Sequence, residues 1–157
     1  MNHTDTAVTG LLGRPPLLYL GCLAAGLVLD RVQPLPVGFP EMFSWTAGAG
    51  LILAGAAVFA AAVRNFARAA TPVPSNRPVR ALVTTGIHGW SRNPIYVGLC
   101  LVYAGIGMAM RSPWVLILAL PLVVVLRYAI VAREEAYLER RFGDAYRDYK
   151  AHVRRWF

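Results

Sequence analysis

The chain has 157 residues, which is enough for one domain or one membrane bundle. Hydrophobic residues make up 57% of it and the mean hydropathy is +0.48, above the usual range of soluble domains. The net charge is +8, but five arginines and no acid lie between Arg64 and Arg92, a bias that indicates the inside loop of a membrane protein and disfavours a nucleic-acid partner.

The first part of the chain predicts two membrane-spanning helices. Residues 17–32 form a short apolar run, and three prolines in residues 33–40 favour an extended connection after it. Residues 42–63 contain no charged side chain over 22 positions, and about 20 apolar residues suffice to cross a bilayer. Three glycines in this second run would allow another helix to approach closely: Gly48, Gly50 and Gly55.

Residues 64–93 form the longest polar stretch of the chain. It begins as a continuation of the preceding helix, with Arg64 and Arg68 one turn apart. The proline-rich run over residues 71–78 then ends any helix. A loop of this length in so small a protein is usually either functional or disordered.

A second hydrophobic hairpin follows. Residues 95–110 and 112–126 are free of charged side chains, and only Arg111 and Ser112 connect the two spans. Pro94 fits the first turn of the third span, with Asn93 or Ser91 as its cap. The short connection predicts a tight antiparallel pair.

After Ala132 the chain becomes amphipathic. Gly143 is expected to end one helix and Asp144 to cap the next. This pattern is typical of a helix that lies along the membrane surface, because apolar side chains recur at spacings of three and four: Leu138, Phe142, Ala145, Tyr149, Val153 and Trp156.

Together these elements predict an all-α, integral-membrane bundle of about four transmembrane helices plus a C-terminal interfacial helix. We divide this single domain into an N-terminal hairpin (1–63), a cytoplasmic loop (64–93), a C-terminal hairpin (94–132) and a tail (133–157). The positive-inside rule places both termini in the cytoplasm. Fifteen arginines to one lysine suit a bacterial protein, and hence its inner membrane. A soluble protein with a large core is the alternative, but so few polar residues could hardly cover its surface.

Even numbers of spans bring the polar loop and the tail to the same face of the membrane. Arg92, at the mouth of the third span, can hold a carboxylate through paired hydrogen bonds or can simply face lipid phosphates. His88 and Asn93 add donors and acceptors beside it. Tyr96 and Tyr146 could stack on a base or face a cation, although membrane interfaces use the same residue type.

The carboxylates Glu134 and Glu135 follow the fourth span. Adjacent helical residues point about 100° apart, so at most one of the two can face a pocket squarely. A carboxylate there could pair with an ammonium or sulfonium cation, or both could belong to a solvated charge run. Arg127 lies seven residues before Glu134, which predicts a shared helix face. It could hold an anionic acceptor, or it could extend to the nearby interface.

The combined pattern resembles a known family. Residues 86–98, with Arg92, Pro94, Tyr96 and Gly98, are similar to the Arg-His-Pro-x-Tyr-x-Gly signature of isoprenylcysteine carboxyl methyltransferases and bacterial phospholipid methyltransferases. Asn93 stands where that family usually has His, and His88 where it often has Tyr or Phe. The likeness covers residues 71–157 and includes a downstream pattern: Glu134, Glu135, Leu138, Phe142, Gly143, Tyr146, Tyr149 and Val153.

The resemblance implies a membrane methyltransferase that uses S-adenosylmethionine, releases S-adenosylhomocysteine and acts on a lipophilic small molecule among membrane lipids. Arg127 and Glu135 are the predicted catalytic residues, and no metal site is predicted. The oligomeric state stays open. The predicted cofactor-binding residues are His88, Arg92, Asn93, Pro94, Tyr96, Gly98, Glu134, Glu135 and Tyr146.

Two other functions compete with this interpretation. Sterol-type membrane reductases, which use NADPH, look similar in their C-terminal hairpin and glutamates but are generally larger. A non-catalytic membrane protein could use the basic loop to bind partners or anionic lipid.

Overall fold

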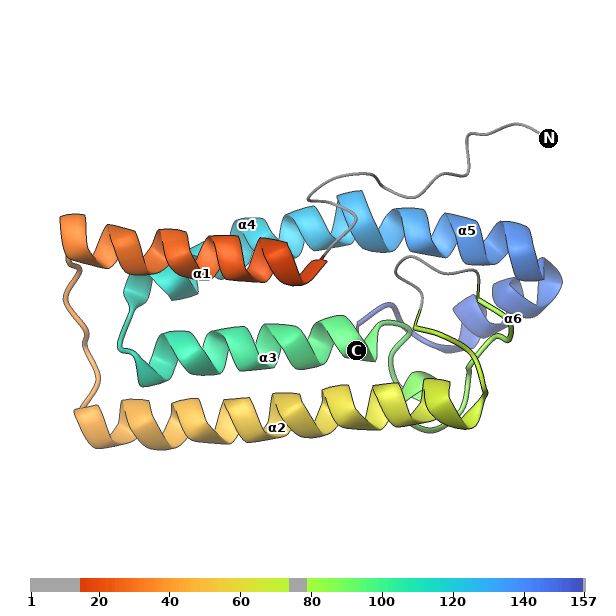
Figure 1. Cartoon of the computed structure of the whole chain (residues 1–157), viewed down its shortest axis with the longest axis horizontal. Coiled ribbons are helices and arrows are strands. Elements are labelled where there is room, and N and C mark those ends of the chain that lie inside the picture. The colour runs from red at the N-terminus through yellow and green to blue at the C-terminus, as the bar shows by residue number, and fades with distance from the viewer. Residues whose placement is uncertain (1–14, 74–78, 157) are drawn as a thin grey trace.

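The computed structural model describes residues 15–73 and 79–156 (Figure 1). Within these ranges every regular element is helical, which confirms the predicted all-α membrane bundle. The elements in chain order are α1 (Pro15–Val32), α2 (Glu41–Arg68), the 3-10 turn η3 (Gly86–Gly89), α3 (Pro94–Ala109), α4 (Pro113–Val125), the π-helical turn η4 (Leu126–Val131), α5 (Ala132–Phe142) and α6 (Asp144–His152).

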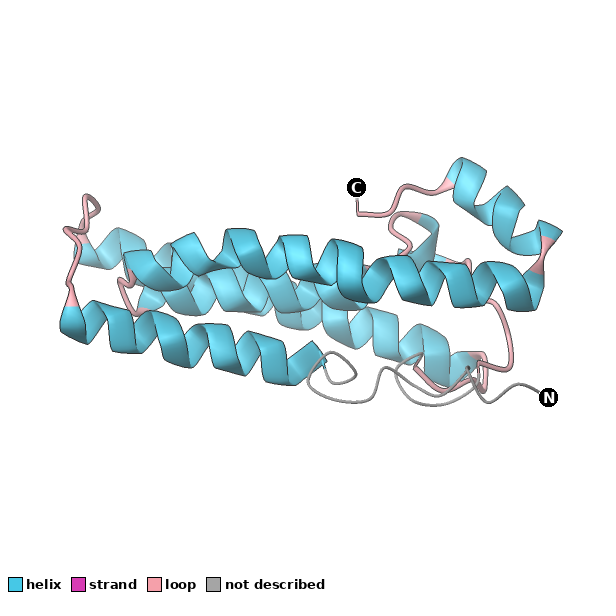
Figure 2. Ribbon diagram, turned by 90° about the horizontal axis from the view of Figure 1, so that it is seen from above, coloured by secondary structure: helices cyan, strands magenta, loops and turns pink. Residues whose placement is uncertain are grey.

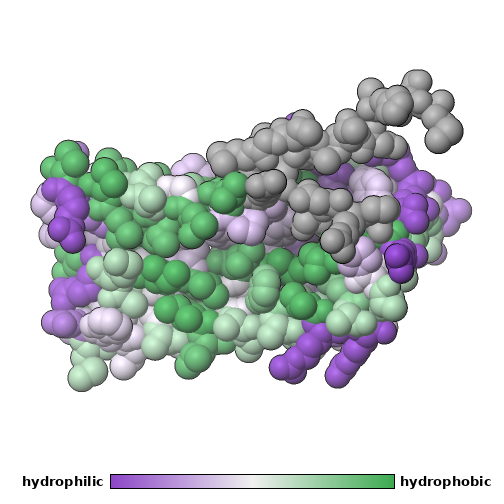
Figure 3. All heavy atoms as spheres, viewed as in Figure 1, coloured by the Kyte–Doolittle hydropathy of each residue, from purple (hydrophilic) through white to green (hydrophobic). Residues whose placement is uncertain are grey.

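The apolar helices α1, α2, α3 and α4 run side by side along the long axis of the molecule (Figures 1 and 2). Three of those described, α1, α2 and the continuous helix Pro113–Phe142, are long and apolar enough to cross a membrane, and α3 is a shorter apolar helix. Large apolar side chains face outward along the bundle, for example Leu53 and Leu120, each more than 70% exposed. Figure 3 shows this apolar surface between hydrophilic ends. Such a surface needs lipid rather than water around it.

The helices α2 and α3 pack backbone against backbone through facing glycines. A Cβ atom on Gly55 would lie 2.5 Å from the carbonyl oxygen of Gly98, and one on Gly48 would lie 2.7 Å from that of Gly105. Both distances are too short for any side chain. Gly50, in contrast, has no atom within 4 Å of such a Cβ position, so the expected close approach holds for Gly48 and Gly55 but not for Gly50.

The hairpin of α3 and α4 turns at Arg111 and Ser112, as predicted. The Ser112 hydroxyl accepts a hydrogen bond from the Val115 N–H over 3.1 Å and so caps α4. Asn93 occupies the N-cap position of α3 but makes no side-chain cap bond. Its amide instead contacts the C-terminal tail, which brings the start of α3 into the site.

The end of the fourth span differs from the prediction. Hydropathy suggested that a separate interfacial helix begins near residue 133, but η4 and α5 continue α4 without a break to Phe142 (Figure 1). The chain turns only at Gly143, which has a positive φ of 55° that favours glycine. Gly143 is therefore also the N-cap of α6, and Asp144 is the first residue of that helix rather than its cap.

Candidate functional site

The loop before α3 and the C-terminal tail are bonded to each other at one end of the bundle. The Arg92 N–H donates to the Arg154 carbonyl over 3.0 Å. The Asn93 side-chain amide and the Ser91 hydroxyl both donate to the Arg155 carbonyl, over 3.1 and 3.3 Å. These hydrogen bonds to the backbone carbonyls of the tail hold two segments that are about 60 residues apart in sequence against each other.

Glu135 forms a buried cluster with two arginines, here called the Glu135 clasp (Arg92, Glu135 and Arg155). Glu135 lies 3.1 Å from the Arg92 guanidinium and accepts a two-pronged pair of hydrogen bonds from Arg155, over 3.1 and 2.6 Å. The side chains of Arg92 and Glu135 are only 9% and 7% exposed. Two guanidinium partners satisfy this carboxylate, so the clasp joins α5, the loop before α3 and the tail.

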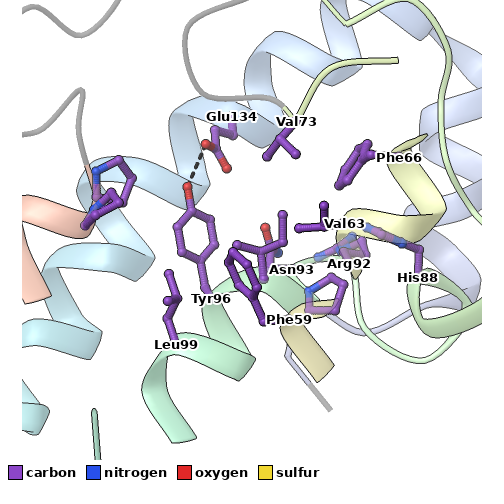
Figure 4. A pocket seen from close by; sticks show the side chains of 14 residues that line it. Phe59, Val63, Phe66, Val73, His88, Arg92, Asn93, Tyr96, Leu99 and Glu134 are labelled. Carbon is purple, nitrogen blue, oxygen red and sulfur yellow. Dashed lines mark hydrogen bonds between the residues drawn. The ribbon is translucent and has the colours of Figure 1, made fainter. Parts of the chain in front are cut away.

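Glu134 faces the other way, into a cavity of about 190 Å³, here called the Glu134 pocket (Figure 4). One of its carboxylate oxygens accepts a hydrogen bond from the Tyr96 hydroxyl over 2.7 Å. The alternative that the sequence left open is thereby settled for this structure, with Glu134 lining the pocket and Glu135 turned to the tail. The lining is mostly apolar: Pro15, Pro16, Phe59, Val63, Phe66, Val73, His88, Arg92, Asn93, Pro94, Ile95, Tyr96, Leu99 and Glu134.

His88 forms part of the pocket wall as a buried ring. It packs edge-on against Phe66 with ring centroids 4.8 Å apart, and its Nδ1 lies 3.4 Å from the Asn65 amide nitrogen. Burial lowers the pKa of His88 to about 4, so the ring is neutral at neutral pH. A neutral imidazole can accept from the Asn65 amide, which itself donates to the Thr85 carbonyl over 2.8 Å.

The tyrosines of α6 support this wall from behind. The Tyr149 hydroxyl donates to the His88 carbonyl over 2.7 Å, and Tyr146 packs against Tyr149 with ring centroids 6.1 Å apart. Burial raises the pKa of Tyr146 and raises that of Tyr149 to about 12, so both hydroxyls stay protonated. Tyr146 therefore fixes the tail and does not line the pocket.

Six of the predicted site residues line the pocket together, and four lie elsewhere. Glu135 and Tyr146 lie behind it, as described above. Gly98 faces Gly55 of α2, where helix packing accounts for it. The six that line the pocket are His88, Arg92, Asn93, Pro94, Tyr96 and Glu134.

Arg127, a predicted catalytic residue, lies outside this group. Its side chain is exposed, and its guanidinium sits 5.6 Å from the centre of the Tyr128 ring. The prediction assumed that seven residues make two α-helical turns, but η4 intervenes between Arg127 and Glu134. A π-turn holds more residues than an α-turn, so seven residues no longer make two full turns. The side chains of Arg127 and Glu134 therefore point to different faces of the helix.

Sequence reasoning missed the contribution of the first two helices to the pocket. Phe59, Val63 and Phe66 line it from α2, and their spacing of four and three residues marks one helix face that could have been recognised. Arg155 was missed as well, because no pattern distinguishes it from the other basic residues of the tail.

Comparison with known proteins shows which protein family the chain resembles. Residues 43–145 match the family described as PEMT, phospholipid methyltransferase. An uncharacterized protein of Haemophilus influenzae is 56% identical over 34 residues, which are 22% of this chain and 54% of that protein. The chain thus covers about half the length of this curated relative. No solved structure matches.

Proposed function

The chain belongs to the phospholipid methyltransferase family, and from this membership we propose that it is an integral-membrane methyltransferase that uses S-adenosylmethionine and acts on a lipophilic acceptor. The observation that carries the proposal is the convergence of α2, the loop before α3 and Glu134 around one pocket, at the end of the bundle where the tail is bonded to that loop. The charge bias favours the inner membrane of a bacterium, with this end and both termini in the cytoplasm.

The residues present fit the charged end of that cofactor. The Nε of Arg92 is buried and has no hydrogen-bond partner among the described residues, although Arg92 lines the pocket. A buried donor of this kind calls for an acceptor, and the cofactor's carboxylate would supply one. The Glu134 carboxylate, held by Tyr96, would face the cofactor's ammonium or sulfonium.

The pocket is too small to hold the whole cofactor in the described arrangement. Its volume of about 190 Å³ lies below the roughly 300 Å³ at which small-molecule sites begin. Binding therefore requires the pocket to widen from the described arrangement.

When bound, S-adenosylmethionine would supply an electrophilic methyl group. The chain's own part is to align the acceptor with that group and to exclude water, and alignment can lower a barrier by several kcal/mol. The apolar side chains from α2 and α3, such as Phe59 and Leu99, suit a lipophilic acceptor. Arg127 and Arg133 are both exposed and outside the pocket lining, whereas Glu134 is inside it. This arrangement favours a neutral or cationic acceptor over an anionic one.

A binding experiment tests the proposal. Purified protein in a non-ionic detergent is titrated calorimetrically with S-adenosylhomocysteine, alongside the variants Glu134→Gln and Glu139→Gln. We expect saturable binding that is about tenfold or more weaker in Glu134→Gln, since a hydrogen bond to a charged group contributes about 1.5–3 kcal/mol. Glu139, paired with Lys150 at the surface, is the matched control and should bind like the wild type. Folded protein without saturable binding would contradict the proposal.

A further inference from the structure

A second cavity, of about 320 Å³, lies at the opposite end of the bundle from the Glu134 pocket. It is formed by the end of α1, the connection to α2 and the turn between α3 and α4, which meet at the left of Figure 1. Hydrophilic side chains gather at this end in Figure 3. The volume falls within the range of small-molecule sites.

Two arginines from distant parts of the sequence line this cavity, and both lack a strong counter-ion. Arg31 makes no ion pair with any residue that the structure describes. Arg111 lies 3.8 Å from Glu41, whose side chain is 72% exposed, and such an exposed pair contributes little. Arg31 and Arg111 thus both keep donors for another partner.

The acid in the cavity wall is already engaged. The Asp30 carboxylate accepts a hydrogen bond from the Ser112 hydroxyl, which in turn caps α4. Asp30 keeps its negative charge, so the cavity offers two guanidinium groups against one carboxylate, and its lining remains net positive towards an anion.

We propose that this Arg31–Arg111 cavity binds a phosphate group, carried by an anionic lipid in the leaflet opposite the Glu134 pocket. Guanidinium groups bind phosphate oxygens through paired hydrogen bonds, which makes phosphate the best match among common anions. Leu27, Leu35 and Met110 line the cavity beside the arginines and suit the glycerol and upper acyl carbons of a lipid. The cavity also lies where the apolar helices end, which is the depth of lipid headgroups.

Titration of the full chain in a non-ionic detergent tests the proposal. The probes are short-chain phosphatidylglycerol, diacylglycerol of the same chain length, and inorganic phosphate. We expect saturable binding of phosphatidylglycerol, none of diacylglycerol, and at least tenfold weaker phosphatidylglycerol binding in Arg31→Gln and in Arg111→Gln. Arg68→Gln, at the other end of α2, is the control for nonspecific attraction and should bind like the wild type. If inorganic phosphate binds as tightly as phosphatidylglycerol, the proposal that a lipid carries the bound phosphate is overturned.

A glycine variant separates binding from folding. Arg111 has a φ of +53°, where glycine is favoured and other residues are strained. Arg111→Gly should therefore unfold at the same temperature as the wild type or higher, yet bind phosphatidylglycerol at least tenfold more weakly. Unchanged affinity in this variant, or an equal loss in Arg68→Gln, overturns the site. Binding of S-adenosylhomocysteine should be unchanged in all these variants, so the two proposals can fail separately.

Discussion

Two adjacent glutamates illustrate how one residue's neighbours decide its role. Glu135 is buried between two guanidinium groups, whereas Glu134 makes a hydrogen bond to Tyr96 and faces a cavity. The negative charge of Glu135 compensates the positive charge of the buried Arg92 guanidinium. The second environment leaves the carboxyl group of Glu134 facing the cavity, where a ligand can reach it. Substitution of Glu135 should therefore lower the stability of the fold, whereas substitution of Glu134 should weaken ligand binding.

We predict that Glu135→Ala lowers the free energy of unfolding by about 3 kcal/mol or more, because it leaves the buried Arg92 without its partner. The measurement is reversible unfolding in mixed micelles with increasing dodecyl sulfate. Glu139→Ala removes a more exposed pair with Lys150 and should cost less than about 1 kcal/mol. Equal losses in the two variants would show that the clasp contributes no more than a surface pair.

His88 should make the folded protein sensitive to acid. Its pKa is about 4 in the folded chain, against an ordinary value of about 6.5. Between these values the unfolded chain binds a proton at this ring and the folded chain does not, so stability falls as the pH drops from about 6.5 towards 4. The loss should reach about 3 kcal/mol and then level off below pH 4.

The test compares unfolding of the wild type and His88→Gln across this pH range in detergent. The variant should lose less stability than the wild type between pH 7 and pH 4. Parallel pH profiles of the wild type and the variant would show that folding does not lower the pKa of His88.

Sequence alone could place these residues at one end of the bundle but could not orient them. The spacing rule stated correctly that only one of Glu134 and Glu135 can face the pocket. It could not say which, because the answer depends on the π-turn over residues 126–131, which no residue pattern marks. The same turn explains why Arg127 does not share a face with Glu134.

At the scale of elements, glycine positions decide how closely α2 and α3 approach. The second helix contains three glycines with the same helix propensity, and the structure assigns them different surroundings. Gly55 touches the backbone of α3 at Gly98, whereas Gly50 faces open space. Composition predicted close packing, and only the helix register could show which glycines take part in it.

We predict that Gly55→Ala destabilises the bundle by about 1–3 kcal/mol, because its Cβ would lie 2.5 Å from the Gly98 carbonyl oxygen. Gly50→Ala should instead stabilise it by up to about 1 kcal/mol, since alanine is the better helix former and meets no atom there. Both are measured as shifts in thermal unfolding under identical detergent conditions. Loss of stability in both variants would indicate a further contact at Gly50, such as a second copy of the chain.

The helix ends were harder to predict than the helices. The chain becomes amphipathic after Ala132, so the sequence suggested that the span ends there, yet the helix continues to Phe142. Backbone hydrogen bonding does not depend on apolar side chains, and nothing before Gly143 breaks it. Gly143, which has a positive φ, ends this helix, and Gly143 was predicted from the sequence as a helix end.

At the scale of the whole molecule, the parity of the spans determines where the site forms. Each hydrophobic hairpin returns the chain to the face it left, so the loop before α3 and the tail after α5 meet at one end (Figure 1). The connection between α1 and α2 lies at the other end. This arrangement follows from span count alone, which is why the meeting of these two segments could be predicted while the contacts between them could not.

The last prediction concerns orientation in the membrane. Asp148→Cys on α6 and Gly38→Cys in the α1–α2 connection are made with Cys22 and Cys100 replaced by alanine, and both positions are exposed. A membrane-impermeant maleimide should label Gly38→Cys in intact bacterial cells and Asp148→Cys only in inverted vesicles, because the basic end faces the cytoplasm. The opposite pattern would reverse the orientation while leaving the bundle intact. Labelling of both positions from one side would contradict a structure in which these segments lie at opposite ends of membrane-spanning helices.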